Sequence, residues 1–144
     1  MKAAPACLCL YLLKGLSACA LLAALGCGGL RIVPVSGKAT LDGQPLTRGV
    51  ISFNPDPAKG NNVRAACTGR IKGDGQYEIF TDDGSHVKKG APLGWYKVTI
   101  LSVTPGDDKP LPVNKQYTDP DTTRLSIEVV ADPKPGAYDL EFKK

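Results

Sequence analysis

The sequence predicts an all-β fold, a seven-stranded antiparallel β-sandwich that follows an N-terminal signal helix. From Val33 onward, apolar and polar residues alternate in one short segment after another, which is the pattern of half-buried strands. No segment beyond that point has the period of an amphipathic helix. Turns rich in Gly, Pro and Asp separate the segments, and short strands between such turns are typical of a β-sandwich.

Residues 33–41 form the first expected strand, and one of its faces carries Val33, Val35, Ala39 and Leu41. The dipeptide Asp42-Gly43 follows as a strong hairpin signal, because a tight type I′ turn needs positive φ at both central residues. A second strand comes next, and its Ile51 and Phe53 are expected to face inward.

Two further strands are expected between a loop at residues 54–62 and an exposed loop at residues 82–90. The first of them spans residues 63–72, with an inward face made of Val63, Ala65, Cys67, Gly69 and Ile71. The second has Tyr77 and Ile79 on its inward face and ends before the exposed loop begins.

The last three strands are separated by a long, proline-rich connection at residues 104–124 and a turn at residues 132–136. The inward faces of these strands are expected to be made of Tyr96, Val98 and Ile100, then Leu125, Ile127 and Val129, and finally Tyr138, Leu140 and Phe142.

The N-terminal segment has the features of an export signal. Lys2 and Lys14 are the only charged residues before Cys27, and both are positive. The apolar run at residues 16–25 is too short to span a bilayer core of about 30 Å at about 1.5 Å per residue. The alternative is an uncleaved membrane helix over residues 3–25, which would bury Lys14 near its centre at a cost of roughly 2.5 to 3.5 kcal/mol.

Gly26 and Cys27 follow small and apolar residues, and this stretch resembles the lipobox of bacterial lipoproteins. Ala24 and Leu25 depart from the residues most common at their positions in that family. The resemblance implies cleavage between Gly26 and Cys27, and attachment of a diacylglycerol and an amide-linked acyl chain such as palmitate to Cys27. It divides the chain into a removed signal peptide (residues 1–26), a lipidated cysteine with its tether (27–32) and a β-sandwich domain (33–144).

Composition excludes several classes of protein. Without residues 1–26 the net charge falls from +4 to about +2, and the charges are interspersed, so we expect no nucleic-acid partner. Of the five cysteines, Cys27 would be capped by its lipid, and Cys67 is the only one that follows it. A disulfide framework is therefore excluded, and Cys67 is expected to be a small buried hydrophobe rather than a reactive thiol.

Three stretches share a pattern of strand, turn and strand: residues 35–46 (VSGKATLDGQPL), 68–77 (TGRIKGDGQY) and 92–100 (PLGWYKVTI). In this order they resemble the carboxypeptidase regulatory-like domain, a transthyretin-like β-sandwich that is also likened to Cna B-type repeats. The resemblance extends from about residue 33 to residue 142. It implies an accessory module of exported or surface proteins, without a catalytic centre, that serves in folding, spacing or binding.

Candidate catalytic and metal-binding residues are few. His86 is the only histidine, and it lies in a Gly-Ser loop beside Asp82 and Asp83, where solvated surface is a better explanation than metal ligation. Calcium at Asp74 or at the Asp82-Asp83 pair is an alternative, but turn formation explains these aspartates without a metal. We therefore expect a protein that is not an enzyme and has no catalytic residue, metal or cofactor.

Trp95 is the only tryptophan and alternates opposite to Tyr96, so its side chain is expected either to face outward or to be partly buried under a neighbouring loop. An outward Trp95 beside Lys97 and Arg70 could stack on a sugar or on a partner protein. These three residues are the candidate ligand contacts.

An internal isopeptide bond is a further possibility implied by the likeness to B-type repeats, some of which join a Lys to an Asn or Asp with the help of an acid. Lys38, Glu78 and Asp139 are the right residue types. All three alternate outward, however, so no apolar site would shift their pKa values, which argues against the bond.

The leading expectation is a lipid-anchored, non-catalytic module of the cell envelope with a structural or protein-interaction role, whose partners are the membrane and an envelope protein or polysaccharide. Gly28 is not the Asp that retains lipoproteins at the inner membrane, so an outer-membrane address is preferred. The alternatives are a polysaccharide- or peptide-binding module that uses Trp95, and an accessory subunit of an exported hydrolase.

Overall fold

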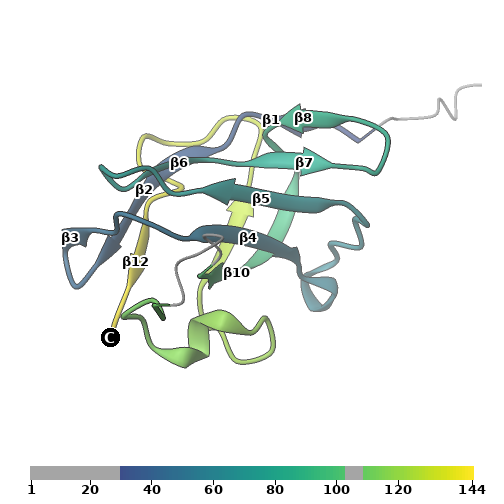
Figure 1. Ribbon diagram of the computed structural model, residues 1–144. Helices are drawn as coiled ribbons and strands as arrows, with labels where there is room; N and C mark the ends of the chain where they lie inside the picture. Colours follow the sequence, from purple (N-terminus) through teal and green to yellow (C-terminus); the bar gives the residue numbers. More distant parts are fainter. Residues whose placement is uncertain (1–29, 103–108) are drawn as a thin grey trace, which may run out of the picture.

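The computed structural model of the chain describes residues 30–102 and 109–144, and these form an all-β structure (Figure 1). The strands are β1 (Ile32–Val33), β2 (Ser36–Leu41), β3 (Gln44–Pro45), β4 (Val50–Pro55), β5 (Ala66–Arg70), β6 (Gln76–Glu78), β7 (Phe80–Asp82), β8 (Val87–Lys89), β9 (Ala91–Pro92), β10 (Gly94–Leu101), β11 (Ser126–Val129) and β12 (Leu140–Phe142). Two short 3-10 helices are η1 (Pro57–Lys59) and η2 (Lys115–Thr118). The expected signal helix and Cys27 lie outside the described residues. Within those residues no helix is long and apolar enough to cross a membrane.

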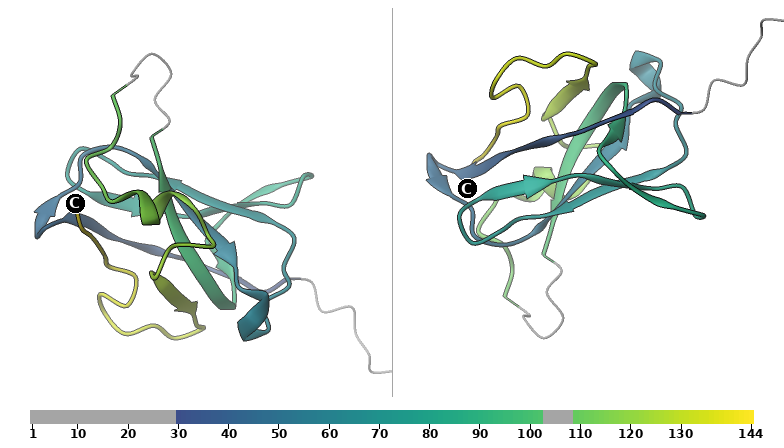
Figure 2. Two further views of the ribbon diagram at one scale, coloured as in Figure 1. Left: turned by 90° about the horizontal axis from the view of Figure 1, so that it is seen from below. Right: turned by 90° about the horizontal axis from the view of Figure 1, so that it is seen from above.

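The strands pair into two larger sheets and one short ladder. The first sheet has six strands in the order β11-β10-β4-β5-β7-β8, all antiparallel to their neighbours. The second sheet has four strands and is built on β2, which pairs with β3, β6 and β12. The short ladder joins β1 to β9. The turn between β7 and β8 lies at one end of the molecule, and the β2–β3 turn and the C-terminus lie at the other (Figures 1 and 2).

The turn at Asp42-Gly43 is confirmed as a tight hairpin. Asp42 has φ of 49° and Gly43 has φ of 82°, so both central residues take the left-handed conformation that a type I′ turn requires. The strands on either side are in register, with Leu41 opposite Gln44. This hairpin is therefore a local feature that the dipeptide alone specifies.

The inward faces of the two longest paired strands are confirmed as well. Phe53 of β4 lies opposite Val98 of β10, and Ile51 lies opposite Ile100. All four side chains are at most 1 % exposed. Because successive side chains of a strand point to opposite faces, alternation in the sequence correctly identified which face of this ladder enters the core.

The expected fourth strand is two strands in different sheets. β6 pairs with β2 and β7 pairs with β5, so the chain passes from one sheet to the other at Ile79. Gly69 permits this crossing, because a Cβ at that position would lie 2.2 Å from the carbonyl oxygen of Glu78. Tyr77 and Ile79 still face inward, and both are at most 1 % exposed.

Several expected boundaries differ from the structure. The first expected strand, residues 33–41, is divided into β1 and β2, and Tyr138 lies in the turn before β12. The loop at residues 82–90 contains a strand, β8, whose three residues are all exposed, so no apolar alternation marks it. The third strand begins at Ala66 instead of Val63. The reason is local, because the backbone N–H of Val63 donates to the side-chain oxygen of Asn61 at 3.2 Å and not to a neighbouring strand.

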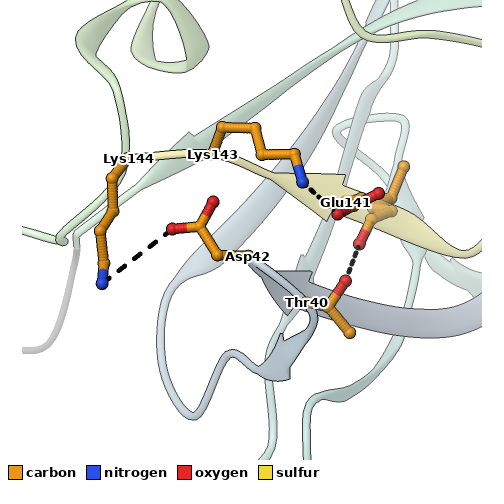
Figure 3. A network of polar contacts seen from close by, with 6 residues as sticks. Thr40, Asp42, Glu141, Lys143 and Lys144 are labelled. Atoms are coloured by element: carbon orange, nitrogen blue, oxygen red, sulfur yellow. Dashed lines mark hydrogen bonds and ion pairs between the residues drawn. The ribbon is translucent and has the colours of Figure 1, made fainter.

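The C-terminal strand β12 pairs with β2 in parallel, an exception to the antiparallel pairing expected of all the strands. The connection from β11 carries the chain from the first sheet to the second. Figure 3 shows the polar contacts here: Thr40 donates to the carbonyl of Leu140 at 3.3 Å, Lys143 pairs with Glu141, and Lys144 approaches Asp42 at 4.0 Å. These ion pairs are exposed, and such pairs add little stability.

A single apolar core draws on both large sheets. Its largest fully buried members are Tyr77, Tyr96, Phe53, Phe142, Ile51, Ile79 and Ile100. Two of the tyrosines place their hydroxyl groups on backbone carbonyls, since Tyr77 donates to Tyr138 and Tyr96 donates to Pro92, the latter at 2.8 Å. Each ring thus fills the core while its polar atom is satisfied.

Alkaline pH is expected to weaken the fold through these tyrosines. Burial raises the pKa of Tyr96 to about 12, and it also raises the pKa of Tyr77. An unfolded tyrosine titrates near pH 10, so the folded protein keeps protons that the unfolded chain releases. The free energy of unfolding should be intact below about pH 10 and fall as the pH rises towards 12. Urea unfolding across this range measures it, and an equally steep fall in Tyr96→Phe would contradict the assignment to Tyr96.

Candidate functional site

Trp95 lies at the start of β10 on the outer face of the six-stranded sheet, and its side chain is partly buried. The ammonium of Lys59 lies 3.7 Å from the centre of the Trp95 ring, a cation–π contact, and also donates to the hydroxyl of Ser126 at 3.0 Å. Lys59 belongs to η1, whose start is capped by Asp56 and whose end is Gly60 at φ of 82°. The loop containing η1 therefore covers part of Trp95.

The same loop holds the backbone of Trp95. The carbonyl of Trp95 accepts hydrogen bonds from the backbone of Asp56 at 3.0 Å and from the side chain of Asn61 at 2.9 Å. Both donors are at most 5 % exposed. A larger residue in place of Gly94 would be strained, because its φ is 134° and a Cβ there would lie 3.1 Å from the side chain of Asn61. Trp95 is thus a fixed residue at the junction of a strand and a loop.

Of the other two candidate ligand contacts, Lys97 lies beside Trp95 and Arg70 does not. Lys97 is two residues along β10 on the same face as Trp95, opposite Asn54. Arg70 lies opposite Val50 of β4. From the register, it is about 13 Å from Lys97 along the strands and about 10 Å across them. Sequence alternation predicted the shared face correctly but contains no information about this separation.

Arg70 instead lines a shallow recess with an exposed aromatic residue that the sequence did not single out. The recess is formed by Arg70, Ile71, Lys72, Glu78 and Phe80, and Phe80 is 41 % exposed. Glu78 is engaged by Lys89, whose ammonium lies 3.0 Å from the carboxylate, and this bond lowers the pKa of Glu78. The exposure of Phe80 could not be predicted from the sequence, because this residue follows Ile79 at the point where the chain changes sheet.

The turn at residues 83–86 is organised by Asp83. Its carboxylate accepts hydrogen bonds from the Ser85 hydroxyl at 2.7 Å, from the Ser85 backbone at 2.9 Å and from the His86 backbone at 2.8 Å. These donors, the Ser85 hydroxyl foremost, hold the pKa of Asp83 well below its usual range. Asp83 is therefore a turn-forming residue. No cluster of three or more potential metal ligands occurs in residues 30–102 or 109–144.

A contact between Ser85 and His86 has some features of a nucleophile and its base. The Ser85 hydroxyl lies 3.0 Å from Nδ1 of His86. In a catalytic triad the acid orients the histidine, whereas here the side chain of Asp83 binds the serine hydroxyl. The imidazole is left without an orienting acid in an exposed turn, so this geometry does not assemble a hydrolytic centre.

Cys67 is a buried residue of the core. Cys67 is 1 % exposed, its sulfur lies 3.4 Å from the Thr81 hydroxyl, and burial raises the pKa of its thiol. It is thus a buried side chain with little thiolate character.

The residues considered for an isopeptide bond take part in other polar contacts. The backbone N–H of Lys38 donates to the Asp139 carboxylate at 2.9 Å. The carboxylate of Glu78 forms an ion pair with Lys89.

A scan against protein-family models, a search of curated proteins and a search of solved structures each found no match to this chain. The resemblance to the carboxypeptidase regulatory-like domain therefore rests on the three sequence stretches alone.

Proposed function

We propose that this protein is a non-catalytic module of the bacterial cell envelope that is exported and then anchored to a membrane by a lipid on Cys27. The domain after the anchor is a β-sandwich of the transthyretin-like type, with a structural or protein-interaction role. What supports the sandwich is the single core that takes side chains from both the six-stranded and the four-stranded sheet.

The observation that carries the proposal is the position of Cys27 relative to the folded domain. β1 begins at Ile32, only a few residues after Cys27. The buried core of the described residues begins at Val35. Cleavage between Gly26 and Cys27 would therefore remove a positively charged and apolar leader without removing any of these core side chains.

A non-catalytic role agrees with the chemistry of the described residues. The buried thiol of Cys67 is inaccessible, and the Ser85–His86 contact lacks an acid on the histidine. The acidic side chains of the turns are used as hydrogen-bond acceptors for nearby backbone, as in Asp74 with Gln76 and Asp83 with His86. A structural or docking role requires no catalytic group. It requires only a stable fold at a defined location in the cell.

The lipid anchor gives that place. A diacylglycerol together with an amide-linked acyl chain supplies more than the two signals that stable membrane attachment requires. Gly28 follows Cys27 where inner-membrane lipoproteins carry Asp, so the proposed address is the outer membrane. The partners would be the bilayer and an envelope component in contact with the exposed strands.

The mass of the protein isolated from membranes tests the anchor, beside a Cys27→Ala variant. We expect the wild-type chain to have lost residues 1–26 and gained the mass of a lipid, and to fractionate with membranes. Cys27→Ala should lack the lipid and be either unprocessed or released. A full-length, unlipidated wild-type chain would refute the proposal and would make the N-terminal segment itself the anchor.

The geometry does not favour the alternative function of polysaccharide or peptide binding by Trp95. Lys59 covers the ring at 3.7 Å, and Arg70 lies at the other end of the sheet. The remaining alternative, an accessory subunit of an exported hydrolase, is compatible with the same anchored module and differs only in the identity of the partner.

A further inference from the structure

The chain enters the domain at the same end as two surface turns. Asp82 pairs with Ala66, so the turn after β7 lies beside the start of β5. Tyr96 pairs with Pro55, so the start of β10 lies beside the end of β4. Ile32 pairs with Pro92 just ahead of β10. The views agree that the N-terminal entry, η1 and the β7–β8 turn lie at one end, opposite the C-terminus (Figures 1 and 2). We call this the tether end and define it as residues 30–34, 56–65 and 82–89.

The tether end exposes apolar side chains that have no role in the core. Val87 on the edge strand β8 is 66 % exposed, and Leu30, just ahead of β1, is 51 % exposed. These are the two most exposed large apolar residues among those described. β8 also lies close to β1, so the two apolar side chains belong to neighbouring segments.

The charges at the tether end are mainly positive. Its basic residues are Arg31, Lys59, Arg64, Lys88 and Lys89, and its acidic residues are Asp56, Asp82 and Asp83. Asp56 is buried, with 4 % exposure, and caps η1. Asp82 and Asp83 accept hydrogen bonds from the backbone of their own turn. Arg31, Arg64 and Lys88 are exposed, and so are Asp82 and Asp83, which keep their charge. Five basic residues against three acidic ones leave the tether end with a formal net charge of +2.

The anchor limits how far this end can be from a membrane. Ile32 is held in the ladder with β9. An extended chain spans at most about 3.3 to 3.6 Å per residue, so the segment from Cys27 to Ile32 reaches no more than about 18 Å. With Cys27 inserted through its lipid, the tether end is held within that distance of the bilayer, and the β2–β3 turn lies at the opposite end of the domain.

We propose that the tether end is a docking surface for lipid headgroups, with Leu30 and Val87 entering the interface and Arg31, Arg64 and Lys88 contacting anionic phosphates. Buried apolar area combined with basic side chains is the chemistry that holds proteins on anionic membrane surfaces. The inference rests on the proposed lipid anchor and adds a defined orientation of the domain. The opposite end, with the β2–β3 turn and the C-terminus, would then be presented to other envelope components.

Trp95, the only tryptophan, lies at the tether end of β10 and reports the contact. The mature lipidated protein would be placed in vesicles of phosphatidylcholine, with or without about a quarter phosphatidylglycerol, that carry a nitroxide-labelled headgroup lipid. We expect Trp95 fluorescence to be quenched at least two-fold more strongly on the anionic vesicles. Arg31→Glu with Lys88→Glu should abolish this gain, and Val87→Ser should reduce quenching on both kinds of vesicle.

The matched control reverses the same number of charges at the far end, with Lys143→Glu and Lys144→Glu, and it should keep the full gain. A second probe, Gln44→Trp in a Trp95→Phe background, should show little quenching. Equal quenching of Trp95 on neutral and anionic vesicles, or equal loss in both charge variants, would refute the docking surface while leaving the anchor intact. A mass without lipid would instead refute the anchor, and with it the docking that depends on it.

Discussion

Replacing Gly90 with alanine should cost the protein at least about 3 kcal/mol of its free energy of unfolding, enough to unfold a domain of ordinary stability. Gly90 has φ of 110°, and a Cβ there would lie 2.0 Å from the carbonyl oxygen of Val33. Neither the backbone of Gly90 nor that of Val33 can shift easily to relieve this contact. The N–H of Gly90 donates to Ile79 at 2.7 Å, its carbonyl accepts from Thr81 at 2.7 Å, and Val33 is held in the β1–β9 ladder. Urea unfolding of the variant measures the loss.

Gly84→Ala is the matched control for this prediction. Gly84 also has positive φ, at 84°, but a Cβ there would meet nothing within 4 Å. Only the backbone conformation is then strained, which costs about 1 kcal/mol. The difference between the two variants isolates the close approach of Gly90 to β1. Similar losses in both would show that β1 does not pack against Gly90 as described.

Phe142→Ala should destabilise the protein by about 3 to 5 kcal/mol, the range expected when a large buried aromatic side chain is removed. Phe142 is 0 % exposed and ends β12, the strand that pairs with β2 in parallel. Its ring meets that of Tyr117 edge to face, with centroids 5.3 Å apart. The variant would leave a cavity between the C-terminal strand and η2. Thermal and urea unfolding, followed by tyrosine fluorescence or circular dichroism, measure the effect.

Phe80→Ala provides the comparison at an exposed position. It removes the same side chain from the outer face of the six-stranded sheet, where Phe80 is 41 % exposed. Part of the ring's burial is lost but no cavity forms, so we expect about 1 kcal/mol or less. A Phe142→Ala variant as stable as Phe80→Ala would mean that β12 is not part of the core, and the parallel pairing would have to be abandoned.

The two predictions concern the segments that connect the domain to its surroundings. Gly90 holds the strand through which the chain enters from Cys27, and Phe142 holds the C-terminal strand β12. If the tether end faces the membrane, Gly90→Ala would loosen the domain on its anchor side. Phe142→Ala would loosen the side that is presented outward. The two variants therefore affect different surfaces although both act through the core.

The sequence predicted which residues of the candidate site lie on one face of a strand, but it did not predict the distances between them. Trp95 and Lys97 were placed on one face by alternation, because that pattern depends only on neighbouring residues. The distance of Arg70 from them depends on the register of β4 with its two neighbours. Register is set by side chains far apart in the sequence, so it cannot be predicted from the residues of a single strand. Partial burial of Trp95 under a loop was one of the two expectations, but that the covering residue is Lys59 depends on the pairing of β4 with β10, which places η1 beside Trp95.

Local sequence patterns are enough to predict the all-β character, the hairpin at Asp42-Gly43 and the inward faces of the strands that contain Phe53 and Val98. These follow from local chemistry, namely the φ values a turn requires and the two-residue period of a strand. Three features are seen only in the folded chain: the change of sheet at Ile79, the place of β8 in the six-stranded sheet, and the parallel pairing of β12 with β2. Each of these depends on which strands become neighbours, and that choice is made by burial of the whole core rather than by any one segment.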